Sequence, residues 1–305
     1  MSFVIFTDGC SNLPGAILNR HQIRTLPFTY TINGQQITYS GDIESFDAHA
    51  HYELLRAGEL IQTSLANTQQ FIDQFRPVLE SGSDIVYVGM SSGISGTYQA
   101  SSIAAAELME EFPERRVRTV DSLGAGLGTG LLTVMAAALR DDGKTADEAA
   151  DILDQKRMDL CEFFTVDNLM FLRRTGRLST TGALVGTMRN IKPILRGDEE
   201  GHIVVCHKCR GRKKAVDTLA QLYETRVVDP ENQYVAITHG DCLEEAQALA
   251  DRICTIAKPK ELIFCPHEPV TGSHVGPVCW RFSSLAKDGK IYPCSDRSRD
   301  SFIFP

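Results

Sequence analysis

Short apolar runs alternate with longer segments of helical period along the first half of the chain. Runs of about four to eight apolar or β-branched residues are typical of buried strands. In the first half they are Phe3–Thr7, Arg24–Ile32, Asp84–Met90 and Arg118–Val120. In the second half they have more polar edges and are Glu162–Val166, His202–His207, Tyr234–Thr238, Glu261–Cys265 and Ser301–Phe304. The alternation with helices favours βαβ units and a parallel sheet in the first half.

Helix starts are indicated by capping boxes, in which two side chains satisfy backbone N–H groups at a helix amino terminus. The candidate pairs are Asn67 with Gln70, Thr145 with Glu148, and Asp241 with Glu244. Another helix is expected from near Gly96 to Phe112, because Pro113 cannot continue it.

These patterns predict an α/β fold of two domains. An amino-terminal, Rossmann-like domain with a parallel sheet and helices would span residues 1–160. A carboxy-terminal α/β domain with a mixed or antiparallel sheet would span residues 161–305. We place the boundary after the amphipathic segment Ala146–Met158. The polar edges of the later strands favour a sheet with one covered face.

Composition narrows the classes of function. The 305 residues are 43% hydrophobic, and the net charge of −8 argues against nucleic-acid binding. Met1 and Ser2 lead directly into the first strand without a basic leader, so we expect a cytoplasmic protein. The uncharged stretch between Asp121 and Arg140 contains four glycines and two threonines. It predicts a glycine-rich loop and a buried helix, without stable membrane insertion.

Nine cysteines are scattered along the sequence. An odd number without a secretory leader is typical of reduced thiols in the cytosol. Cys206 and Cys209 have the spacing of metal ligands, but a structural zinc needs four ligands and no second pair is evident. We therefore expect no metal site.

The segment Tyr87–Tyr98 contains a hydrophobic strand, a Ser/Gly loop and a helix start. Such an arrangement aims hydroxyls and free backbone N–H groups at one point, which suits an anion. The alternative is a tight turn with Ser95 as a simple helix N-cap. The spacing matches neither a Walker loop nor a Gly-x-Ser-x-Gly nucleophile elbow, and Gly124 to Gly130 misses the dinucleotide spacing.

Other candidates are single polar residues in predicted loops. Arg177 follows Thr-Gly and offers a planar, permanently charged fork for a carboxylate or phosphate, unless it is an ordinary surface arginine. His274 lies in a stretch rich in Gly and Pro, where a ligand contact and a simple turn are both plausible. Asp8 and Asp121 end strands and could serve catalysis, although strand-end Asp residues more often bind loop N–H groups.

Together these stretches resemble the DegV family of fatty-acid-binding carriers. The similar segments, in chain order, are Thr7–Pro14, Thr63-Ser64, Ser91–Tyr98, Asp121-Ser122, Gly176–Ser179, Ile191–Leu195, Lys213–Ala215 and Ser273–Pro277. They extend over nearly the whole chain. The sequence departs from the family pattern at Leu65-Ala66-Asn67 and at Val278-Cys279-Trp280.

The resemblance implies a bound long-chain fatty acid and no cofactor or catalytic residue. The residues it implies for the fatty-acid carboxylate are Thr63, Ser92, Ser95, Gly96, Arg177 and His274. It also implies a partner, a separate ATP-dependent fatty acid kinase that converts the presented carboxylate to an acyl phosphate for phospholipid synthesis. The acyl-chain preference, the oligomeric state and the identity of the kinase stay open.

Two other functions compete with a carrier. Ser95 and His274 could form the nucleophile and base of a hydrolase or phosphotransferase, provided that they lie within hydrogen-bond reach. Alternatively, the protein could be a lipid-sensing regulator that binds a fatty acid only to control another protein.

Overall fold

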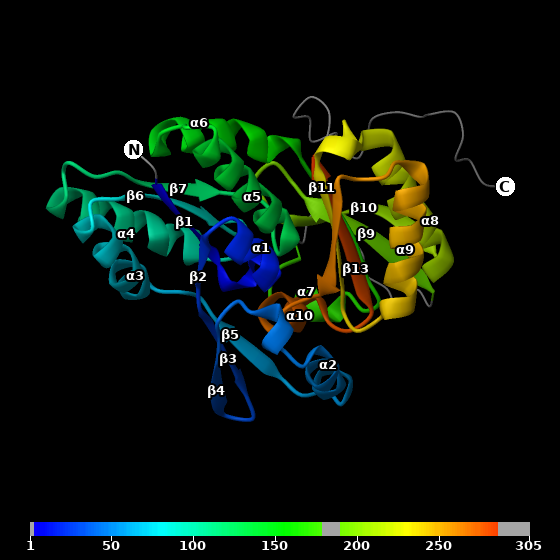
Figure 1. Ribbon diagram of the computed structural model, residues 1–305. Helices are drawn as coiled ribbons and strands as arrows, with labels where there is room; N and C mark the ends of the chain where they lie inside the picture. The colour runs from blue at the N-terminus through cyan, green and yellow to red at the C-terminus, as the bar shows by residue number, and fades with distance from the viewer. Residues whose placement is uncertain (1–2, 179–189, 286–305) are drawn as a thin grey trace.

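The computed structural model describes residues 3–178 and 190–285 (Figure 1). The predicted strand Ser301–Phe304 and Cys294 lie outside these ranges. Three sheets organise the described chain, with four, six and three strands. In the described ranges, no helix combines the length and the apolar character needed to cross a bilayer.

The first sheet is entirely parallel, as predicted, and contains β2 (Ile23–Leu26), β1 (Phe3–Asp8), β6 (Asp84–Gly89) and β7 (Val117–Asp121) in that order. Its central strands β1 and β6 are nearly continuous apolar runs because helices cover both faces of the sheet. Helices α3 (Thr68–Glu80) and α4 (Thr97–Glu111) pack on one face. The other face carries α1 (Gly15–Arg20), α5 (Leu127–Asp141) and α6 (Ala146–Lys156).

The six-stranded sheet is mixed, as predicted for the second half. Its order is β10 (Ile203–Arg210), β9 (Ile191–Gly197), β8 (Leu160–Val166), β13 (Cys279–Leu285), β11 (Tyr234–His239) and β12 (Glu261–Pro266). Only β11 and β12 pair in parallel. Helices α8 (Arg212–Arg226) and α9 (Leu243–Ile256) cover one face and share a core with it (Figure 1).

The third sheet corrects the prediction of a single strand over Arg24–Ile32. Pro27 lacks a backbone N–H and ends β2, so the chain enters a different sheet as β3 (Phe28–Ile32). This small antiparallel sheet also contains β4 (Gln35–Tyr39) and β5 (Ile61–Ser64). Both strands contain several polar residues, so the apolar pattern did not predict them. Helix α2 (Ala48–Arg56) packs beside it through Tyr52 and Leu55 (Figure 1).

Two of the three predicted capping boxes are confirmed. Both reciprocal hydrogen bonds are present at Asn67 with α3 and at Thr145 with α6. The box at Asp241 is wrong, because α9 begins at Leu243 with Cys242 as its N-cap. The Asp241 carboxylate instead binds the Arg56 side chain on α2.

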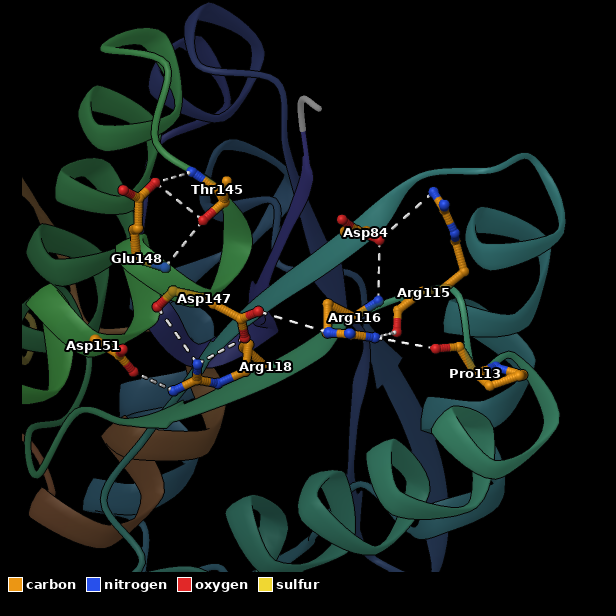
Figure 2. A network of polar contacts seen from close by, with 9 residues as sticks. All are labelled: Asp84, Pro113, Arg115, Arg116, Arg118, Thr145, Asp147, Glu148 and Asp151. Carbon is orange, nitrogen blue, oxygen red and sulfur yellow. Dashed lines mark hydrogen bonds and ion pairs between the residues drawn. The ribbon is translucent and has the colours of Figure 1, made fainter.

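The amino ends of β6 and β7 are tied together by charged residues (Figure 2). Arg118 on β7 contacts Asp147 at 2.9 Å and Asp151 at 2.7 Å, and both carboxylates belong to α6. The N–H of Arg116 donates to Asp84 at 3.0 Å. These contacts lie at the opposite end of β6 from its loop to α4.

The boundary between the two domains, at residues 160 and 161, stays a prediction. The parallel sheet takes strands only from residues before 122, and the mixed sheet only from Leu160 onwards. One core nevertheless contains Val86 and Val120 from the first sheet together with Ala236 and Ile263 from the second.

Candidate functional site

A cavity of about 140 Å³ lies at the carboxyl end of β6, where the first sheet meets the other two. Binding sites of parallel α/β sheets characteristically form at the carboxyl ends of strands. Five of the six predicted site residues line it: Thr63, Ser95, Gly96, Arg177 and His274. The apolar part of the lining consists of Phe28, Leu65, Met90, Ile94, Ala125, Leu172, Ile203, Val270 and Val275.

Two strand-end aspartates hold the Ser/Gly loop in place. The Asp8 carboxylate accepts a 2.7 Å hydrogen bond from the N–H of Met90 and also binds the Tyr87 hydroxyl. Asp121 accepts from the N–H of Ser92 at 3.2 Å and from that of Leu123 at 3.0 Å. Burial raises the pKa of Asp8 to about 6, against the effect of these hydrogen bonds. Both aspartates therefore bind loop N–H groups. This is the structural role that the sequence analysis gave as the alternative to catalysis.

The amino terminus of α4 borders the cavity. Gly96 is its N-cap residue, so Ser95 is not the N-cap that the alternative interpretation required. The Ser95 hydroxyl lies 3.0 Å from the hydroxyl of Thr97 and accepts weakly from the N–H of Thr97 at 3.3 Å. The first N–H groups of this 15-residue helix carry partial positive charge, which favours an anion beside Ser95 and Gly96.

Ser92 is the predicted site residue that does not line the cavity. Its side chain is exposed, while the neighbouring Ser91 is buried and donates its hydroxyl to the carbonyl of Gly201 at 2.9 Å. The bond from the backbone of Ser92 to Asp121 fixes this orientation. Of the two predicted serines, Ser95 lines the cavity and Ser92 lies outside its lining.

His274 and Thr63 meet across 211 residues of sequence. The Nε2 atom of His274 lies 2.9 Å from the Thr63 hydroxyl on β5. His274 is at the end of the short helix α10 (Pro269–Val275), not in the loop that its Gly/Pro-rich surroundings predicted. The helix forms because Glu268 accepts hydrogen bonds from the N–H groups of Val270 and Thr271. Burial, with Arg177 and Arg174 nearby, lowers the pKa of His274 to about 4.

Arg177 brings a cation to the same cavity. Its Nε donates to the carbonyl of Ile94 at 3.3 Å and its Nη1 to the carbonyl of Thr175 at 2.5 Å. Burial lowers its pKa, because desolvation disfavours the charged form. Arg173 and Arg174 on α7 (Met170–Arg174) are exposed, and Arg174 stacks over the Phe171 ring at 4.3 Å. Among these three arginines, Arg177 alone lines the cavity.

The arrangement favours a carboxylate with an apolar chain. A permanently charged guanidinium, a neutral imidazole, two hydroxyls and a helix amino terminus line the cavity. Apolar side chains line much of the remaining wall. A buried carboxylate needs several donors and a counter-charge to offset its desolvation, and these residues provide both.

Comparison with known proteins identifies the family. A family model described as "Uncharacterised protein, DegV family" matches residues 2–286. The chain belongs to the DegV family. A DegV domain-containing protein of Clostridium perfringens is 37% identical over 275 residues, covering 90% of this chain and 94% of that protein.

Solved DegV structures share the fold. A DegV family protein from Thermus thermophilus, described by its fatty acid binding, is 27% identical with a TM-score of 0.82. DegV of Bacillus subtilis, described as a fatty acid binding protein, is 26% identical with a TM-score of 0.80. Each match covers 94% of this chain and 100% of the other. The predicted family and α/β fold are confirmed.

Sequence reasoning missed three polar residues of this DegV cavity, Ser64, Thr271 and Arg281. Arg281 lies on β13 with 2% of its surface exposed. The available signal was a charged residue flanked by Trp280 and Phe282 in an apolar stretch, which requires a buried partner. That partner is Glu162 on β8, at 2.6 Å.

The geometry does not pair Ser95 with His274. Ser95, the candidate nucleophile, contacts Thr97. His274, the candidate base, contacts Thr63 instead. A serine hydrolase needs the base to reach the nucleophile directly. The hydrolase alternative therefore lacks its central contact in this arrangement.

Proposed function

We propose that this DegV protein is a cytoplasmic carrier that binds a long-chain fatty acid through its carboxylate. Thr63, Ser95, Gly96, Arg177 and His274 would hold the head group. The observation that carries the proposal is the convergence of these five residues, from distant parts of the sequence, on one cavity. The fatty-acid-binding descriptions of the Thermus thermophilus and Bacillus subtilis relatives support it.

The acyl chain supplies the driving force for binding. Transfer of a methylene from water to an apolar environment contributes about 0.8 kcal/mol. A chain of ~15 methylenes would contribute ~12 kcal/mol before the entropy of ordering is subtracted. The head group then fixes the orientation, because Arg177 and the donors beside it would be left without their anion in the reverse arrangement.

The proposed role is to present the carboxylate to a separate ATP-dependent fatty acid kinase, which would form an acyl phosphate for phospholipid synthesis. The family resemblance supports this step, and the neutral His274 beside the head group could orient the acid for transfer. A lipid sensor would bind the same ligand without supporting turnover. Acyl-phosphate formation in a mixture of the carrier, the kinase, ATP and palmitate would distinguish a carrier from a sensor.

The direct test is the ligand itself. Lipid extracted from the purified protein and analysed by mass spectrometry should contain a saturated or monounsaturated fatty acid. The delipidated protein should take up added palmitate or oleate. An extract without fatty acid, together with no uptake of either compound, would overturn the proposal.

A further inference from the structure

We propose that Arg281 forms a second polar subsite in the cavity and that the preferred ligand is a fatty acid with a hydroxyl or keto oxygen close to its carboxylate. This inference rests on the proposed function and specifies its substrate class. The starting observation is Arg281, a buried cation that is not one of the proposed head-group residues.

Contacts on two sides fix Arg281 in the cavity wall. Its Nη1 donates to the carbonyl of Ala125 at 2.8 Å and to Glu162 at 2.6 Å. Its guanidinium lies over the Phe164 ring, 4.6 Å from the centroid. Its Nε is buried and has no hydrogen-bond partner within residues 3–178 and 190–285. Because β13 pairs with β8 and β11, the backbone of Arg281 is held as firmly as the side chain.

The charge of Arg281 determines which kind of group it can bind. Glu162 already neutralises the guanidinium, and it also accepts from the N–H of Ala125 at 3.2 Å. A second carboxylate on the ligand would have to compete with Glu162 in a buried position. A neutral oxygen accepts a hydrogen bond from the guanidinium without disturbing the ion pair. A hydroxyl or keto group is therefore the better match.

The proposed oxygen lies near the carboxylate because the subsite and the head-group residues share one cavity. Arg177 and Arg281 both line it. Thr271, a second polar residue of the wall, precedes His274 by three positions on α10. Side chains with this spacing lie about 5–6 Å apart on one helix face. The subsite therefore faces the first few carbons of the chain.

A plain acyl chain fits this wall less well. Methylenes beside Arg281 would leave its buried Nε without a hydrogen-bond partner. Sites built to hydrogen-bond a ligand hydroxyl discriminate strongly against an analogue that lacks it. We therefore expect the position of the oxygen, and not only its presence, to determine the affinity.

The test compares palmitate, β-hydroxypalmitate and ω-hydroxypalmitate by calorimetry on the delipidated full chain. The β-hydroxy acid should bind about tenfold more tightly than either of the others. The double variant Arg281→Met with Glu162→Gln leaves no unpaired buried carboxylate. In this variant the preference for the β-hydroxy acid should disappear. Arg118→Met, which changes an arginine far from the cavity, should keep the wild-type preference.

Two results would overturn the inference: equal binding of β- and ω-hydroxypalmitate by the wild type, or an unchanged preference in the double variant. The wild-type comparison decides the matter even if the double variant does not fold. No binding of any of the three acids would instead contradict the proposed function. Binding of palmitate without a preference would leave that function intact and refute the subsite alone.

Discussion

Glu268 makes the stability of this protein depend on pH in a direction that a single substitution can reveal. The carboxyl is fully buried at the start of α10, and burial raises its pKa from 4.5 to about 7. Hydrogen bonds from Thr271 and Val270, and the charge of Arg281, oppose that shift. Gln has the same shape and one acceptor oxygen but does not titrate, so Glu268→Gln isolates the effect of the proton.

The magnitude follows from the two pKa values. As the pH rises from 4.5 to 7, the unfolded chain loses the Glu268 proton while the folded protein retains it. The folded state therefore becomes less stable with rising pH. Between pH 5 and pH 8 this amounts to about 2.5 kcal/mol, at 1.36 kcal/mol per pKa unit. Glu268→Gln removes this loss, so the variant should gain about 2.5 kcal/mol relative to wild type over the same interval.

Urea denaturation of both proteins at pH 5 and pH 8 measures this difference. Loss of one hydrogen bond by Gln would shift the free energy of unfolding by about 1 kcal/mol at both pH values and would cancel in the comparison. Glu148→Gln is the control, because hydrogen bonds from Thr145 lower the pKa of Glu148. This carboxyl is ionised in the folded state and largely ionised in the unfolded state above pH 5, so its substitution should change the free energy of unfolding almost equally at both pH values. A difference between Glu268→Gln and wild type that is the same at both pH values would refute the reasoning.

Other variants test the head group and the fold. Arg177→Ala should weaken fatty-acid binding by about 2 kcal/mol, and Arg173→Ala should have much less effect; equal losses in calorimetry would contradict this assignment. A fluorophosphonate probe should not label Ser95, and labelling detected by mass spectrometry would favour a hydrolase. Asn67→Ala should lower the free energy of unfolding by about 1 kcal/mol in urea, whereas an unchanged value would show that this cap does not stabilise α3.

Local patterns predicted much of the fold. The apolar runs gave the strands of the parallel sheet, and the boxes at Asn67 and Thr145 gave two helix starts, because these signals act between neighbouring residues. Strand β13 was missed because Arg281 interrupts its apolar pattern, and only the distant Glu162 makes that charge tolerable. The false box at Asp241 had the right residue types, but Arg56 from another element binds the carboxylate.

The candidate site was predictable only in part. The Ser/Gly loop before α4 has a local signature, because strand, loop and helix follow one another directly. The contact between Thr63 and His274 depends on the small third sheet and on α10, neither of which the apolar pattern revealed. No local rule distinguishes Ser92 from Ser95, since the difference comes from the bond between the Ser92 backbone and Asp121.

Helix α5 has a consequence for how this protein unfolds. Ten of its fifteen residues are buried, and its core continues from the first sheet into the second. At Gly130 a side chain would meet the carbonyl of Ser11 at 2.8 Å, so the fit on that side is close as well. Separation of the chain at residue 160 would expose apolar surface on both fragments. Heating should therefore disrupt both sheets in one cooperative transition, and neither fragment should be a soluble, independently folding unit.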